Sequence, residues 1–293
     1  MLRLLAIPQA GHFLGYLDSL GLLTAMIPEL VKAKKVKQPK EHSWDVFDHS
    51  IATVVAVDFL LRQGAWGHAD ANVLTFVPWS VRLRRYFEQE VSDGSTRGSL
   101  LKLAALLHDI AKPEAKTIDD GGRIRFLGHA GGGAESAVHV LTRLRFSNKE
   151  VKLVETMVRH HLRPTQMSRG GVPTHRAIYR YFRDTGEAGI DILFLSLADH
   201  LAARGPQLKL AEWKQHAQEA DYILAQRFQE QSLIAPTKLI DGHDLITTFG
   251  MSPGPQIGQL LEVVREAQAA GKLTSREQTL SYVRDCLLIK ERI

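Results

Sequence analysis

The chain has 293 residues, of which 13 are histidine and one is cysteine. Hydrophobic residues make up 44% and charged residues 24%, a balance typical of a globular protein rather than of a disordered chain. A single cysteine excludes an internal disulfide, and it excludes the paired-cysteine sites of thiolate-bound zinc and iron–sulfur clusters. Any metal is therefore expected to be held by histidine and carboxylate ligands.

The net charge is 37 − 32 = +5, and the sequence pI is about 9.3. This modest excess favours phosphate-bearing ligands, but it lacks the basic density of a dedicated DNA-binding domain. No apolar run approaches the roughly 18 residues that a membrane-spanning helix needs. The N-terminus also lacks the features of a cleaved signal peptide. We therefore expect a cytoplasmic protein that does not enter a membrane.

Residues 1–41 are predicted to form an N-terminal helical segment. Two short stretches of helical period lead into VKAKKVKQPK, which contains five lysines. Such a cluster is more typical of a solvated face than of an RNA site.

Residues 42–204 are predicted to form the central domain, because they contain most of the histidines and every candidate metal ligand. Apolar residues recur there at three- and four-residue spacing, which predicts helices over 44–62, 99–108, 134–144, 149–161 and 188–203. The segment 117–126, TIDDGGRIRF, is at most a small hairpin or an ordered loop. Residues 205–293 are predicted to form a C-terminal helical tail domain, with a long helix over 210–230. The chain is therefore expected to be all-α.

The strongest local signal is LLHDIAKP, in which an apolar helix delivers His108 and Asp109 at its end and Pro113 stops it. Imidazole nitrogen and carboxylate oxygen together suit a borderline divalent cation. Two further polar residues interrupt apolar helices, His49 at 59 residues before His108 and Asp199 at 90 residues after Asp109. A carboxylate in such a helix is costly to bury unless it is paired or coordinated.

This order of ligands, His, then His-Asp, then Asp, resembles the HD-domain metal-dependent phosphohydrolases. The stretches RIRFLGHAGGGAESA and LRFSNKEVKLVETMVRHHLRP resemble the HD domain attached to bacterial tRNA nucleotidyltransferases and poly(A) polymerases. The tail SPGPQIGQLLEVVREAQAAGKLTSREQTL and the start YLDSLGLLTAMIPEL are similar to other regions of the same enzymes. The resemblance implies an HD-domain helical bundle with additional N- and C-terminal helices.

The resemblance also implies the ligands of the site. A first divalent ion would be held by His49, His108, Asp109 and Asp199. A second ion bridged by Asp109, or alternatively the substrate phosphate, would be contacted by His129, His160 and His161. One or two ions are expected, and this donor set suits manganese, iron, nickel, cobalt or zinc, with magnesium a further candidate.

The substrate phosphate is expected to meet cationic side chains. Six arginines lie between residues 159 and 183, and of these we expect Arg163 to contact phosphate, together with Lys112 four residues after His108. The other arginines are expected at the surface. His200 is expected at the surface or behind the ligands, and His42 and His216 are expected to be ordinary histidines.

The enzymes named above carry a nucleotidyltransferase head that needs an Asp-x-Asp pair, and no such pair occurs in these 293 residues. We therefore expect hydrolysis of a phosphomonoester or phosphodiester of a nucleotide or RNA end by a metal-activated water, rather than nucleotide addition. The alternative is a tRNA- or RNA-binding relative with little or no catalysis. HD-type oxygenase chemistry at a di-iron site uses a similar ligand set and also stays open, as does the oligomeric state.

Overall fold

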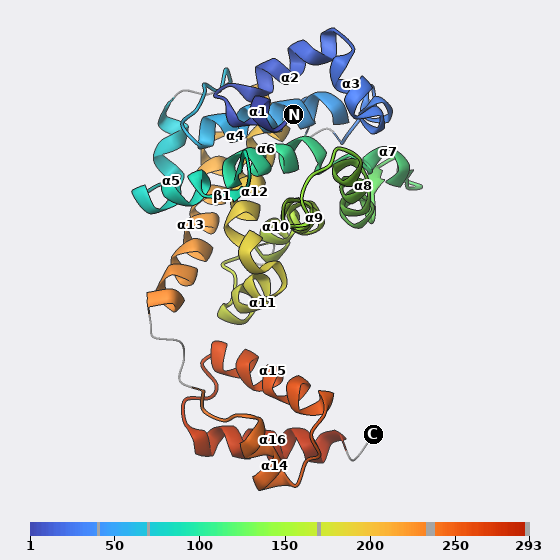
Figure 1. Ribbon diagram of the computed structural model, residues 1–293. Coiled ribbons are helices and arrows are strands. Elements are labelled where there is room, and N and C mark those ends of the chain that lie inside the picture. The colour runs from blue at the N-terminus through green and yellow to red at the C-terminus, as the bar shows by residue number, and fades with distance from the viewer. Residues whose placement is uncertain (40–41, 69–70, 169–170, 233–237, 291–293) are drawn as a thin grey trace. The chain divides into compact units, whose positions relative to one another are not determined.

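The computed structural model describes residues 1–39, 42–68, 71–168, 171–232 and 238–290 (Figure 1). Within these ranges the regular structure is helical except for two short antiparallel strand pairs, so the all-α prediction is confirmed. The α-helices are α1 (Leu2–Ala6), α2 (Ala10–Ser19), α3 (Leu22–Met26), α4 (Val46–Leu60), α5 (Val81–Glu88), α6 (Arg97–Leu107), α7 (Lys112–Ala115), α8 (His129–Arg143), α9 (Asn148–His160), α10 (Arg163–Ser168), α11 (His175–Thr185), α12 (Gly189–Arg204), α13 (Leu210–Ser232), α14 (Gly242–Phe249), α15 (Pro255–Ala269) and α16 (Arg276–Lys290). Short 3₁₀ helices are η1 (Pro28–Ala33), η2 (Ala71–Phe76), η3 (Gly186–Ala188) and η4 (Gly205–Gln207).

The strand pairs are hairpins of two or three residues a side. Strand β1 (Glu90–Ser92) pairs with β2 (Ser95–Thr96), and β3 (Lys116–Ile118) pairs with β4 (Ile124–Phe126). In the second hairpin Lys116 lies opposite Phe126. The hairpin predicted between residues 117 and 126 is therefore present.

The chain divides into two compact units. Unit 1 comprises Met1–Arg169 and Thr185–Tyr222, and unit 2 comprises Gly170–Asp184 and Ile223–Ile293. These divisions fall elsewhere than the sequence-based boundaries after residues 41 and 204. One reason is that α1 packs on α6 and α2 packs on α4, which joins the N-terminal helices to unit 1.

Unit 1 is built around three mutually packed helices, α4, α6 and α12. All 11 residues of α6 are buried, as are 11 of the 15 in α4 and 11 of the 16 in α12. A helix that is apolar on every side must be covered on every side, which explains why these three lie at the centre. Each of them also carries a predicted metal ligand in or directly after its sequence.

A buried ion pair fastens the N-terminal helices to this centre. The Lys102 ammonium on α6 lies 2.7 Å from the Asp58 carboxylate on α4, and both side chains are 1% exposed. Asp58 also accepts a hydrogen bond from the Gly11 amide, and Lys102 donates one to the Ile7 carbonyl. Side chains of two core helices thus satisfy a backbone carbonyl between α1 and α2 and a backbone amide in the first turn of α2.

Helices α8 and α9 pack as a pair beside α6. Apolar spacing predicted that the first of them begins at residue 134. The glycines at 131–133 also have low helix propensity. Helix α8 begins at His129 instead. A Cβ at Gly133 would lie 3.4 Å from the His108 carbonyl oxygen and 3.3 Å from Val158, so the small residue lets α8 approach the end of α6. Tertiary packing therefore overrides local propensity here.

Unit 2 has its own apolar core, contributed by α14, α15, α16 and the residues before and between them: Ile240, Leu245, Leu260, Val264, Ala267, Leu273 and Val283. Helix α11 joins this core through ion pairs. Arg176, Arg180 and Arg183 each bind the Glu266 carboxylate on α15 at 2.6–2.9 Å.

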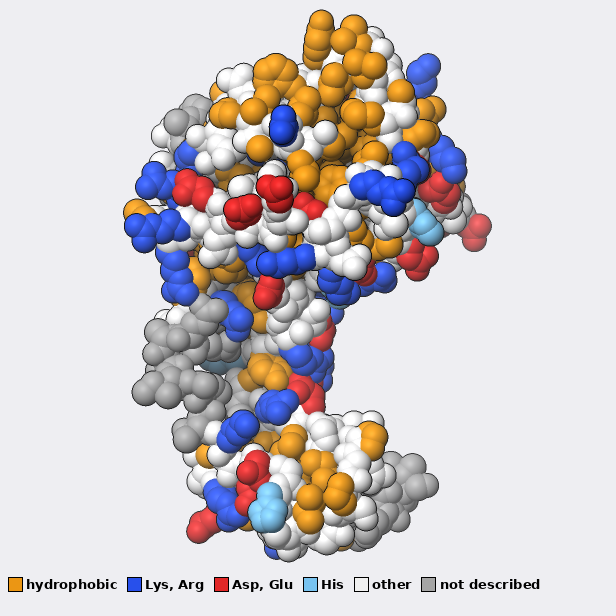
Figure 2. Space-filling view, viewed as in Figure 1, with side chains coloured by type: hydrophobic (Ala, Val, Ile, Leu, Met, Phe, Trp, Pro, Cys, Tyr) orange, Lys and Arg blue, Asp and Glu red, His pale blue; other side chains and the backbone are white. Residues whose placement is uncertain are grey.

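The surface of unit 1 is apolar near its N-terminus. Phe13, Tyr16, Leu20 and Leu22 are 46–64% exposed, and Figure 2 shows hydrophobic side chains gathered over α2 and α3. Among the described residues, no helix combines the length and the apolar character needed to cross a membrane.

Candidate metal centre

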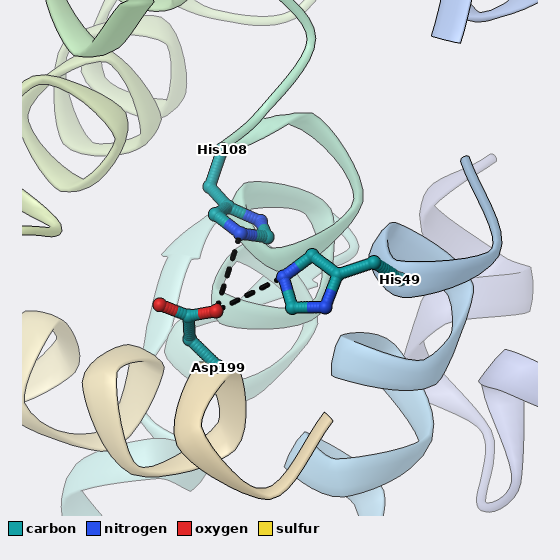
Figure 3. Close-up of side chains that lie close together, drawn as sticks. All are labelled: His49, His108 and Asp199. Atoms are coloured by element: carbon teal, nitrogen blue, oxygen red, sulfur yellow. Dashed lines mark ion pairs between the residues drawn. The ribbon is translucent and has the colours of Figure 1, made fainter. Parts of the chain in front are cut away.

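Three side chains from the three central helices meet at one point. His49 lies in the first turn of α4, His108 directly follows α6, and Asp199 lies in α12. Their polar ends point toward one another, with His49 Nε2 at 2.9 Å and His108 Nε2 at 3.8 Å from Asp199 Oδ1 (Figure 3). The structure thus brings together three residues that are 59 and 91 positions apart in the sequence.

Asp109 stands between this group and a second one. Its Oδ2 lies 3.1 Å from His108 Nε2 and 3.5 Å from His49 Nε2. Its Oδ1 faces the other way, 3.3 Å from His129 Nε2 and 3.9 Å from His161 Nε2. The two oxygens of one carboxylate therefore belong to two different groups of histidines.

The three residues of the second group, Asp109, His129 and His161, are each at most 8% exposed. His129 is the first residue of α8, and His161 directly follows the last residue of α9, so the packed α8–α9 pair delivers both rings. The Nε2 atoms of His129 and His161 are 3.4 Å apart.

Three of the four histidines are oriented by backbone carbonyl groups. The Nδ1 atoms of His108, His129 and His161 lie 2.6–2.8 Å from the carbonyl oxygens of residues 105, 126 and 158, in each case three positions earlier. A carbonyl only accepts hydrogen bonds, so Nδ1 must carry the proton in each ring. In the neutral form of each ring, the lone pair is then on Nε2 and faces the site, as metal ligation requires.

The donor set fits a divalent transition metal. Imidazole nitrogen and carboxylate oxygen bind such ions at about 2.0–2.2 Å, which places neighbouring ligand atoms about 3–3.5 Å apart around a tetrahedral ion. The facing atoms lie 2.9–3.9 Å apart. In addition, His49 Nε2, His108 Nε2 and Asp109 Oδ1 are buried with no hydrogen bond of acceptable angle in the described part of the chain, whereas Asp109 Oδ2 has the Lys112 ammonium at 2.6 Å. Buried polar atoms without a partner are costly, and a bound cation would supply one.

The charges of the site reinforce one another. Burial raises the pKa of Asp109, but His108, Lys112 and His129 outweigh burial and hold the pKa well below its usual range. Burial lowers the pKa of His49, and Asp199 offsets only part of that effect. Burial also raises the pKa of Asp199, but the hydrogen bond and charge of His49 outweigh burial and lower it, so both carboxylates stay ionised at neutral pH while His49 stays neutral. Burial lowers the pKa of His108, but the charge of Asp109 outweighs burial and raises it, so a metal ion bound by this ring would displace a proton.

A cavity of about 460 Å³ opens onto both groups. It is lined by Asp109, Asp199, His129 and His161 together with residues from β4, α10, α12 and α13. Its size lies in the range of small-molecule sites. The site therefore has room for a substrate beside the convergent ligands.

The predicted phosphate contacts differ in position. Lys112 lines the cavity, lies 2.6 Å from Asp109 Oδ2 and donates a hydrogen bond to Gln38. Arg163 begins α10 half-buried and is not among the described lining residues. His160, the last residue of α9, is half-buried and stands outside both convergent groups, whereas the adjacent His161 belongs to one of them.

Three histidines that sequence reasoning left aside line the same cavity. His42 packs edge-on against His49, with ring centroids 5.5 Å apart. His200 stacks on His216 at 4.6 Å, with the rings 17° from parallel. Burial lowers the pKa of His42 to about 4 and that of His200 to about 3, so both are neutral near pH 7. The cavity wall thus presents neutral imidazoles beside the ligands.

Comparison with known proteins agrees with this geometry. A model of the HD-domain family matches residues 81–204, a range that contains His108, Asp109 and Asp199 but not His49. The chain is 29% identical over 281 residues to the A-adding tRNA nucleotidyltransferase of Deinococcus radiodurans, and 28% identical over 284 residues to the CC-adding tRNA nucleotidyltransferase of Thermus thermophilus.

These alignments cover 96% of this chain but 55% and 54% of the two relatives, so the chain spans about half the length of the curated relatives it matches. A CC-adding tRNA nucleotidyltransferase of Geobacter sulfurreducens is 24% identical over 203 residues, 69% of this chain and 38% of that protein. The family match over residues 81–204 and the convergent His and Asp side chains together indicate that the chain contains an HD domain, and nearly the whole chain is similar to part of each of two bacterial tRNA nucleotidyltransferases.

Proposed function

We propose that this chain is a metal-dependent phosphohydrolase that cleaves a phosphomonoester or phosphodiester of a nucleotide or an RNA end. The observation that carries the proposal is the Asp109 carboxylate, whose two oxygens face two separate groups of histidines beside one cavity. His49, His108, Asp109 and Asp199 would hold one divalent ion, and Asp109, His129 and His161 a second. When bound, such ions polarise a phosphoryl oxygen and lower the pKa of a water toward neutrality.

The protein's own residues prepare this chemistry. The carbonyls of residues 105, 126 and 158 fix three imidazoles as Nε2 donors before any ligand arrives, so binding requires no tautomer change. Lys112 lines the cavity beside Asp109, where its ammonium can neutralise an anionic phosphoryl oxygen. Gln38 holds that ammonium in place by accepting a hydrogen bond from Nζ.

The charge of the cavity favours a substrate with a single phosphate group. The cations among its described lining residues are Lys112, Arg125 and Arg204, and each has a carboxylate within 4 Å. A triphosphate carries several negative charges that would need unpaired cations or additional metal ions. A phosphomonoester, a phosphodiester or a cyclic phosphate end matches this wall better.

RNA could supply such a terminal phosphate ester, because the two relatives are named as tRNA nucleotidyltransferases and the net charge of this chain is positive. If RNA binds as a chain and not only at its end, binding should weaken steeply as salt rises. If the protein does not bind tRNA even at low salt, the proposed substrates are restricted to small nucleotides.

The test combines metal content with hydrolysis. After incubation with Mn²⁺ and desalting, we expect two ions per chain for the parent protein and one for His161→Ala. Asp109→Ala should hold fewer than one ion and should hydrolyse no member of a panel of nucleoside monophosphates and 2′,3′-cyclic phosphates. His139→Ala is the matched control, because this histidine lies exposed on α8 away from the site. A parent protein that retains no metal, or an Asp109→Ala variant as active as the parent, would refute the proposal.

A further inference from the structure

The β3–β4 hairpin brings two apolar side chains to the mouth of the cavity. Phe126 ends β4 and Leu127 follows it, and both line the cavity. Leu127 is 75% exposed, the most exposed of the large apolar side chains described. An isolated exposed leucine is ordinary on a protein surface. Here, however, the exposed leucine adjoins an aromatic ring on the rim of a polar, metal-ligating site.

Phe126 connects this rim to the ligands. The Lys112 ammonium lies 5.3 Å from the centre of the Phe126 ring, within the range of a cation–π contact. The ring also meets the His129 ring edge-on, with centroids 6.5 Å apart, while the Phe126 carbonyl accepts the hydrogen bond from His129 Nδ1. One residue therefore orients a predicted ligand through its backbone and leaves its side chain to face the cavity.

The remainder of the wall suits a flat, polar ring as well. The stacked His200 and His216 rings line the same cavity, and His200 Nε2 is buried without a hydrogen bond in the described part of the chain. This part of the wall offers flat ring surfaces and one buried nitrogen, His200 Nε2, that could hydrogen-bond to a ligand. The described lining cations each have a carboxylate within 4 Å, so the wall provides no separate cation for a second phosphate. A sugar phosphate alone would leave the Phe126–Leu127 surface in water.

We propose that Phe126 and Leu127 form a platform on which the nucleobase next to the reacting phosphate stacks, an inference that rests on the proposed hydrolysis. Aromatic and apolar side chains stack on any base, because every base has a flat π-face. The platform selects nucleotides over base-free phosphates, and it tolerates different bases. Because Phe126 also holds His129, a base seated on the platform lies at a fixed distance from the second ligand group.

The test compares a nucleotide with its base-free counterpart in three proteins. Calorimetric titration with 5′-AMP and with ribose 5-phosphate measures binding to Mn²⁺-loaded protein without requiring turnover. We expect the parent to bind 5′-AMP at least tenfold more tightly, and Leu127→Ser to lose about tenfold for 5′-AMP with little change for ribose 5-phosphate. Phe126→Leu removes the ring but keeps the carbonyl that orients His129, and it should behave in the same way.

The control is Ile118→Ser, which makes the same apolar-to-polar change at a 65% exposed residue of the same hairpin that is not among the described lining residues. It should bind both compounds as the parent does. Equal binding of 5′-AMP and ribose 5-phosphate by the parent, or equal losses for both compounds in Leu127→Ser, would overturn the platform. Preferential AMP binding without hydrolysis of any substrate would instead retain the platform and refute the proposed hydrolase.

Discussion

Removing one partner of the buried Asp58–Lys102 pair should destabilise unit 1 in a pH-dependent way. Lys102→Met replaces the ammonium with an apolar group of similar length and leaves the Asp58 carboxylate, which is 1% exposed, with the Gly11 amide as its remaining hydrogen-bond donor among the described residues. Burial already raises the pKa of Asp58, and Lys102 is what limits that rise. Without the lysine, the folded protein favours the protonated carboxyl more strongly.

The size of the effect follows from the cost of protonating the carboxyl. Protonating a carboxylate costs about 1.4 kcal/mol for each pH unit by which the solution lies above its ordinary pKa, which is 3.8 for Asp58. Neutralising Asp58 therefore costs about 4 kcal/mol at pH 7 and about 1.6 kcal/mol at pH 5. This cost is the upper limit of the charge penalty, because the folded variant can always take up the proton. The pH 7 value agrees with the loss of roughly 3–5 kcal/mol in stability found when one partner of a buried ion pair is removed. Since the folded pKa is raised, the penalty is small at low pH and grows as pH rises.

Tryptophan fluorescence during urea unfolding is the appropriate assay. The four tryptophans, at positions 44, 66, 79 and 213, all belong to unit 1, so the signal reports that unit alone. Parent, Lys102→Met and the double variant Asp58→Asn/Lys102→Met are compared at pH 5 and pH 7. The asparagine keeps an acceptor for the Gly11 amide while removing the charge, so the double variant should recover more than half of the loss at pH 7.

Two results would refute this reasoning. One is a Lys102→Met penalty that is the same at both pH values, since an unpaired carboxylate must respond to protonation. The other is a double variant no more stable than Lys102→Met, which would assign the loss to packing of the lysine chain rather than to the orphaned charge.

Three further predictions follow from contacts elsewhere. Gly11→Ala places a Cβ 2.8 Å from the Val55 amide nitrogen and should lower the free energy of unfolding by about 1–3 kcal/mol, measured by tryptophan fluorescence. A Cβ at Gly15 on the same helix meets nothing within 4 Å, so Gly15→Ala should leave the stability unchanged. Glu266→Gln should lower the free energy of unfolding of unit 2 by about 1–2 kcal/mol, measured by following unfolding with far-UV circular dichroism. Hydrogen bonds from Arg180 and its neighbours lower the pKa of Glu266 to about 2. The stability difference between the parent and Glu266→Gln is therefore fully present above pH 4.5 and should shrink as pH falls toward 2. A difference that stays the same over this pH range would contradict the prediction. Chelation of bound metal should lower the melting temperature of unit 1 by about 5–10 °C, with no shift in Asp109→Ala.

The central ligands could be predicted because each lies in or at the end of an apolar helix. Burial forces such helices to the middle of the fold, and a polar residue on them must find a partner there. The resemblance to HD-domain proteins then placed His49, His108 and Asp199 in one group before the packing was known. Both His160 and His161 were predicted to contact a second metal or the phosphate, yet the sequence held a signal that separates them: His161 continues the buried stripe of Val154 and Val158 at helical spacing.

Other features depend on contacts between distant segments. His42 lies outside any helix, and it reaches the cavity because the neighbouring Trp44 indole and Ser43 bind the end of α12 at residues 202–204. The sequence predicted the arginines of α11 to lie at the surface, but it did not reveal their partner Glu266, which comes 83–90 residues later. Helical periodicity carries no information about either pairing, because both are set by tertiary structure.

The three carbonyl groups behind His108, His129 and His161 determine how the site can be damaged. In many metalloproteins a side-chain carboxylate performs this supporting role, and a single substitution removes it. Here the supporting groups belong to the main chain, so replacing residue 105, 126 or 158 with another side chain leaves the acceptor in place. Insertion or deletion of one residue between a carbonyl and its histidine would break the three-residue spacing. The orientation of these rings is thus vulnerable to changes in chain length and resistant to changes in side-chain identity.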